Sequence, residues 1–231
     1  MQPGTERRVF ARSWELLAKN FGVVVPGLAA GVCTAIAQYA LVPWPVAPLA
    51  TSALSRLLLD VVQIVAAIVS ISYTTGMADA AWETGHATLA DGARAFSRDG
   101  RHVLVAMLAL IVLGVAAASL VPYTLALSLV AYAFLCIYTM ASAVVGERPG
   151  VGAVIESAEI AFARPLPTLL LVLGIAAVAV ATGIVGSLFA VVPLVGPLLA
   201  AIVLEASLAY VVLVVVGEYR SLRGSGALLR G

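Results

Sequence analysis

Charged residues are scarce in this chain of 231 residues. Asp, Glu, Lys and Arg make up 11% of it, whereas hydrophobic residues make up 62%. A soluble domain carries roughly a quarter of its residues as charged ones, so water is not the main solvent of this fold. The formal net charge is only +1, and the lack of a basic excess argues against a nucleic-acid partner.

Residues and motifs that carry common chemistry are also few. The two cysteines, Cys33 and Cys136, lie inside apolar runs, and there are only two histidines, which argues against a disulfide framework and a His-rich metal site. The spacing Glu83-x-x-His86 places both residues on one helix face, but di-iron bundles need two such motifs with further carboxylates. Hydrolase, Walker and dinucleotide fingerprints are missing. We therefore expect no catalytic residue, no metal, no cofactor and no enzyme activity.

Long hydrophobic runs dominate what is present. A bilayer core about 30 Å thick needs about 20 mostly apolar residues in each spanning helix. Six segments meet this requirement: 21–41, 54–76, 103–121, 123–145, 166–190 and 198–217. The sequence therefore predicts an all-α, polytopic integral membrane protein, a single domain with six transmembrane helices.

The connections between these segments alternate between two kinds. Those after the first, third and fifth segments contain Pro and no charge (VPWPVAP, VPYT and VVPLVGP), which is typical of tight turns within a hairpin. The other connections and the two ends of the chain hold twelve of the thirteen Lys and Arg residues, all except Arg56. Because Lys and Arg beside spans stay in the cytoplasm, we predict three hairpins in the cell (cytoplasmic) membrane, with both termini cytoplasmic.

Each polar segment ahead of an odd-numbered span contains apolar residues at helical spacing. The apolar faces are Phe10, Trp14, Leu17 and Phe21 in the first, Leu89, Ala93 and Phe96 in the second, and Val154, Ala158, Ala161 and Phe162 in the third. Glu156 and Glu159 accompany the third face as its polar neighbours. Such segments are typical of amphipathic helices in the headgroup plane, so membrane lipids are the expected partners.

Two of these segments also share a short motif. ARAFSR, which ends at Arg98, and EIAFAR, which ends at Arg164, match in Ala-Phe-small-Arg 66 residues apart, and SWELLAKN occupies the corresponding place before the first span. The pattern predicts three pseudo-repeats, at about 5–80, 87–145 and 151–219, similar to the internal duplications of transporter folds.

Ionisable residues inside a bilayer are costly, so each one is a candidate for function. Arg56 and Asp60 lie in the second span and Glu205 in the sixth, with Gln63 and Gln38 nearby in the second and first. Asp60 and Glu205 each lie about seven residues from the outer face, roughly 10 Å at 1.5 Å per residue. We hypothesise that the five form one polar cluster in the outer half of the membrane. The alternative is that Arg56 and Asp60 neutralise each other, while Glu205 faces a subunit contact or stays protonated.

The two ends of the chain carry a family resemblance. The pattern aromatic-x-x-Ser-Trp-x-x-Leu-x-x-Asn at 10–20 (FARSWELLAKN), the three hairpins and the closing EYRSLR at 218–223 resemble a broad group of poorly characterised prokaryotic six-span proteins. That group includes the membrane domain attached to some glycerophosphoryl diester phosphodiesterases. The resemblance implies a six-helix fold and no catalytic residues, because the soluble domain that carries that enzyme's chemistry is absent from this chain.

Three hypotheses on function follow. The first is a non-enzymatic integral membrane protein with a scaffolding or accessory role in the membrane. The second is a small-molecule or lipid permease that uses the polar cluster. The third, implied by the resemblance, is a membrane partner of a separate soluble enzyme. A homo-oligomer and a complex with a membrane partner protein both stay open.

Overall fold

The computed structural model describes residues 5–41, 53–124, 126–189 and 195–224, and within them it contains helices and no strands. In chain order the helices are α1 (Thr5–Lys19), η1 (Phe21–Val24), α2 (Val25–Leu41), α3 (Ala53–Thr84), α4 (Leu89–Ser119), α5 (Val121–Thr124), α6 (Leu127–Cys136), α7 (Thr139–Val144), α8 (Gly150–Ala163), α9 (Pro165–Phe189) and α10 (Val195–Gly224). The predicted turn VPWPVAP and the first four residues of VVPLVGP lie outside the described residues.

Six helical segments are long and apolar enough to cross a membrane, as the sequence predicts. They are Phe21–Leu41, Ala53–Thr84, Leu89–Ser119, Leu127–Val144, Pro165–Phe189 and Val195–Arg223. The chain therefore has the makeup of a multi-pass membrane protein. Side chains that would be buried in a water-soluble fold are exposed along these segments, among them Val112 (68%) and Leu188 (67%), which is the expected state of a surface whose solvent is lipid.

The second predicted surface helix is not a separate element. Residues 89–98 form the first turns of α4, and no Pro interrupts the helix before the third span begins. The start of α4 is fixed by a capping box, in which Thr88 and Asp91 bond each other's backbone N–H groups. The preceding α3 ends at Thr84, because Gly85 adopts a φ of +82° that a right-handed helix cannot continue through.

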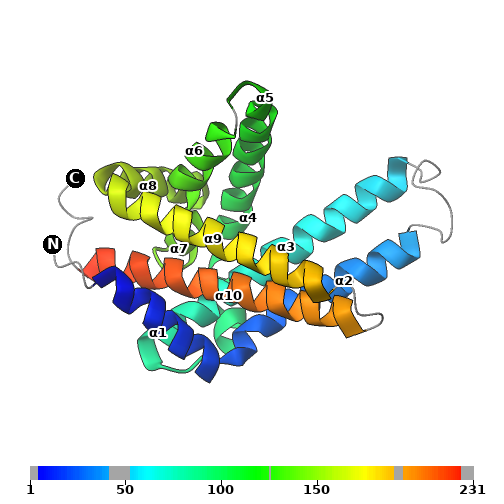
Figure 1. The fold of residues 1–231 in the computed structure, drawn as a ribbon, viewed down its shortest axis with the longest axis horizontal. Coiled ribbons are helices and arrows are strands. Elements are labelled where there is room, and N and C mark those ends of the chain that lie inside the picture. Colours follow the sequence, from blue (N-terminus) through cyan, green and yellow to red (C-terminus); the bar gives the residue numbers. More distant parts are fainter. Residues whose placement is uncertain (1–4, 42–52, 125, 190–194, 225–231) are drawn as a thin grey trace.

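Three pairs of helices form arms that diverge from one another. In Figure 1, α2 lies beside α3, α4 beside α6, and α9 beside α10, and the three arms point in different directions. α1 runs along α10, and α8 packs against α4, α6 and α7. The arms meet where α3 and α10 end and α4 and α9 begin. This region holds Asp79, Asp99, Glu156 and Arg220, and we call it the polar end.

The densest core lies at the polar end. The largest fully buried side chains include Tyr138, Tyr219, Leu16, Met77 and Leu213, and they belong to α1, α3, α10 and the junction of α6 with α7. The outer parts of the arms contribute far less to this core. The three arms are therefore held together mainly at one end of the molecule.

Asn20 joins the end of α1 to the connection between α3 and α4. Its side-chain amide donates to the carbonyl oxygens of Leu16 (3.0 Å) and Gly85 (3.1 Å), and its Oδ1 accepts from the backbone N–H of Ala87 (2.8 Å). The side chain thus satisfies backbone groups that a helix end leaves unpaired. Asn20, the last residue of FARSWELLAKN, therefore has a structural role at the end of α1.

Trp82 and Gly217 form a close contact between α3 and α10. The Trp82 Nε1–H donates to the carbonyl oxygen of Leu213 at 2.7 Å, and the indole ring lies so close to Gly217 that an added Cβ would overlap it. Helices in lipid associate through such close packing and interhelical hydrogen bonds.

Gly217→Ala should therefore destabilise the protein by about 1–3 kcal/mol, the usual cost of overpacking, despite the better helix propensity of Ala. Gly183→Ala, on α9, is the matched control, because nothing lies within 4 Å of its Cβ position. The free energy of unfolding in mixed micelles, measured by detergent titration, checks this. Equal stability of the two variants would contradict the contact.

Candidate functional site

A cavity of about 630 Å³ lies between the three arms. Its walls come from η1, α2, α3, α4, α6, α7, α9 and α10, so residues from all three arms face it. Most of the lining side chains are aliphatic, and the volume falls within the range of roughly 300–1,000 Å³ that small-molecule sites occupy. The cavity can therefore hold a ligand that is largely hydrocarbon.

Few polar side chains face the cavity, and two of them are already bonded to backbone. The Thr75 hydroxyl donates to the Ile71 carbonyl oxygen at 2.7 Å, and the Tyr132 hydroxyl donates to that of Leu110 at 3.1 Å. Glu205 is different. Within the part of the chain that the structure describes, its carboxylate has no hydrogen-bond or ion-pair partner.

Glu205 lies against the first turn of α2. Its Oε2 packs on Gly27, where an added Cβ would overlap the carboxylate. Gly27 is buried and follows Pro26, whose missing N–H is tolerated in the first turn of a helix. The absence of a side chain at 27 thus gives the carboxylate its place at the contact between α10 and α2.

The fourth span is broken beside the cavity. α6 ends at Cys136 and α7 begins at Thr139, and the intervening Ile137 and the flanking Met140 line the cavity. The buried Ser157 of α8 bridges the break: its hydroxyl donates to the Leu135 carbonyl oxygen (2.7 Å) and accepts from the Tyr138 N–H (3.0 Å). A broken membrane helix is tolerated where other protein groups hydrogen-bond its freed backbone N–H and C=O groups. The Ser157 hydroxyl makes both of these hydrogen bonds here.

Glu156, the neighbour of Ser157, does not lie on a solvated face as its place in the sequence predicts. It is 8% exposed and accepts hydrogen bonds from the hydroxyls of Ser142 and, at 3.3 Å, Tyr219, with Arg148 Nε at 3.4 Å. α8 buries this side chain because it packs against α4, α6, α7 and α9 at once. Glu156 therefore ties α8 to α7 and to α10.

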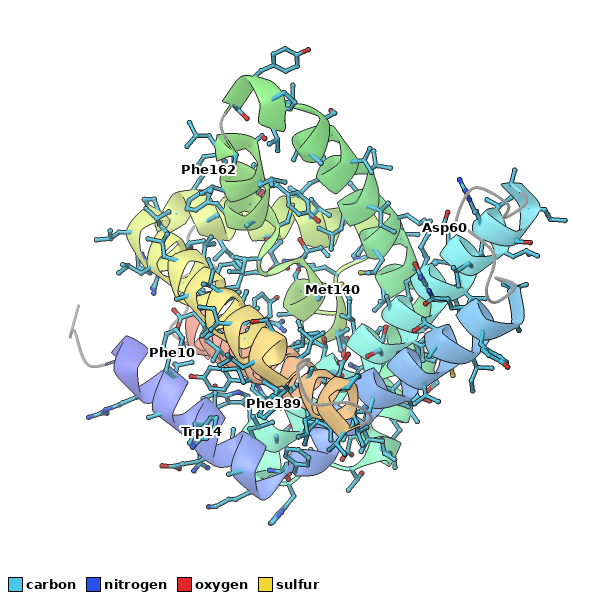
Figure 2. The ribbon with its side chains drawn as sticks, turned by 45° about the vertical axis from the view of Figure 1, so that its right-hand side comes forward. Phe10, Trp14, Asp60, Met140, Phe162 and Phe189 are labelled. Atoms are coloured by element: carbon cyan, nitrogen blue, oxygen red, sulfur yellow. The ribbon has the colours of Figure 1, made fainter. Side chains whose placement is uncertain are left out.

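The five polar residues predicted to cluster are placed in two separate groups. Gln38, Arg56, Asp60 and Gln63 are exposed on the arm of α2 and α3, and none of them lines the cavity; Glu205 does. Figure 2 shows Asp60 far along α3, remote from the central Met140. Ser70, the α3 lining residue closest to Asp60 in sequence, is ten residues further on, or about 15 Å along the helix axis. Equal counts from the two helix ends do not bring the two side chains together, because the arms diverge.

Glu83 and His86 do not share a helix face either. α3 ends at Thr84, so His86 lies beyond the helix, and Glu83 instead lies 3.5 Å from Arg220. Among the described residues, no group of three His, Cys, Asp or Glu side chains could hold a metal ion.

Comparison with known proteins gives no family for this chain: no family model, no curated protein and no solved structure matches it. The cavity and its carboxylate are therefore the observations on which a function can be argued.

Ser157→Ala should destabilise the protein by about 1–3 kcal/mol, because it leaves the buried Tyr138 N–H and Leu135 carbonyl without their partner. Ser187→Ala is the control, since the exposed Ser187 hydroxyl donates to the local Ile184 carbonyl oxygen, and we expect less than about 0.5 kcal/mol there. Detergent-titration unfolding checks both. A Ser157→Ala protein as stable as wild type would show that the break does not depend on this side chain.

Proposed function

We propose that this chain is a non-enzymatic membrane protein that takes up the hydrocarbon part of a membrane amphiphile between its arms, as a lipid-handling accessory protein or lipid permease. The observation that carries the proposal is the 630 Å³ cavity. A body that serves only as a scaffold would be expected to fill its interior at the density of other protein cores.

The broken fourth span supports the same proposal. Transporter folds place their ligands beside discontinuous membrane helices, and here the break between Cys136 and Thr139 borders the cavity. The earlier idea of a permease with a polar cluster in the outer half of the bilayer is thereby revised. Of the five residues in that cluster, only Glu205 belongs to the site proposed now.

The proposed topology keeps three hairpins with both termini in the cytoplasm. Arg98, Arg148, Arg220 and Arg223 lie at the polar end, which is where the bias of Lys and Arg expects the cytoplasm to be. The six-span resemblance described above fits the same arrangement.

α1 is proposed to lie at the membrane interface. One side of it packs on the protein through Val9, Leu16 and Leu17. Trp14 is 65% exposed although its ring contacts Tyr210 of α10 edge-on, and Phe21, the first residue of η1, is 53% exposed. Exposed aromatic side chains beside the basic Arg12 and Lys19 are typical of a helix in the headgroup region of a membrane.

Filling the cavity should abolish lipid uptake without unfolding the protein. Ala133→Trp places an indole on a cavity-lining position of α6, and Ala179→Trp places the same group on an exposed position of α9 as the matched control. The protein is reconstituted with a phospholipid that carries a diazirine at the end of one acyl chain, and irradiated. Mass spectrometry then maps the adducts.

Wild type and Ala179→Trp should carry adducts in peptides that contain the cavity residues Val172 and Ala209, both at most 7% exposed, and Ala133→Trp should lose them. Labelling of wild type at the exposed Val112 but not at Val172 or Ala209 would refute the proposed function.

A further inference from the structure

Glu205 marks one limit of the cavity. On α10 the lining residues extend from Glu205 to Val216, about 16 Å along the axis, and Glu205 is the one farthest from the polar end. The other lining residues of α10 are Leu, Ala and Val. The cavity therefore has a carboxylate at one limit and an apolar wall that leads away from it.

The described residues that line the cavity carry negative charge and no positive charge. Glu205 is the only acidic side chain among the lining residues that the structure describes, and no Lys, Arg or His accompanies it. A carboxylate held in an apolar site without a partner is unfavourable unless it is neutralised or bound by a donor. No described residue supplies that donor, so the Glu205 carboxylate has no cationic partner in the cavity.

We propose that the ligand supplies the cationic partner: the cavity binds a long-chain amphiphile whose head group is a protonated amine. The amine binds the Glu205 carboxylate, and the chain lies along the apolar wall toward the polar end of the protein. This inference rests on the proposed function and adds to it the chemical class of the ligand. Hydrogen bonds between an ammonium and a carboxylate are about twice as strong as neutral ones, so the head group decides which amphiphile binds best.

Gly27 gives the proposal a second test position. An added Cβ there would overlap only the end of the Glu205 side chain, which can move aside without displacing backbone. Gly27→Ala should thus shift the carboxylate and leave the rest of the cavity intact.

Three probes with the same chain separate the head groups: hexadecylamine, hexadecan-1-ol and hexadecanoic acid. Their binding to the full chain in detergent micelles at pH 7, where the amine is protonated, is measured by native mass spectrometry. Wild type should bind hexadecylamine about tenfold more tightly than hexadecan-1-ol, and the acid most weakly.

Glu205→Gln should remove this preference for the amine and leave hexadecan-1-ol binding unchanged, and Gly27→Ala should reduce it. Asp60→Asn is the matched control, because it removes an exposed carboxylate outside the cavity and should keep the full preference. Unchanged elution and circular dichroism confirm that each variant is folded.

Equal binding of all three probes to wild type, or an amine preference that survives in Glu205→Gln, would overturn the amine assignment while the proposed function stands. Failure of wild type to bind any of the three would overturn both.

Discussion

The last turns of α10 hold neighbouring helices together through polar contacts. Arg220 donates to the Asp79 carbonyl oxygen at 2.9 Å, Tyr219 reaches Glu156, and Arg223 donates to the Val145 carbonyl oxygen at 2.9 Å. α10 thereby holds α3, α8 and the end of α7 at once. Lipid gives no hydrophobic force between helices, so packing and polar contacts of this kind decide which helices stay together. Beyond these contacts the arms separate.

That separation is what creates the cavity. Helices joined at one end and diverging at the other leave space between them, and the space has apolar walls because the arms are built from Ala, Val and Leu. Glu205 enters this space from α10 and lies on Gly27 of α2. The broken fourth span beside the cavity is kept in place by Ser157. The polar end therefore positions a carboxylate that none of the described residues near it neutralises.

The six helices that are long and apolar enough to cross a membrane could be predicted from the sequence, because length and hydropathy alone decide whether a helix can span a bilayer. The break after Cys136 could not, since the local sequence LCIYTM has neither Pro nor Gly and the Ser that satisfies it comes from α8. The burial of Glu156 could not be predicted either. Helical spacing shows which residues share a face of a helix, but it does not show which other helices pack against that face. The structure separates Asp60 from Glu205 because their arms diverge, whereas counting along each span assumes parallel helices. The internal repeat and the interfacial position of the surface helices stay predictions.

The divergence of the arms can be measured as a distance between two of them. Tyr39 (82% exposed) near the end of α2 and Tyr123 (85%) at the tip of the arm of α4 can each be replaced by a spin-labelled Cys after Cys33 and Cys136 are changed to Ser. Pulsed electron–electron double resonance in lipid nanodiscs should give a distance between the two labels well beyond the roughly 8–10 Å that separates packed helices. A distribution centred at packed-helix distances would show a closed bundle, in which the arms do not diverge.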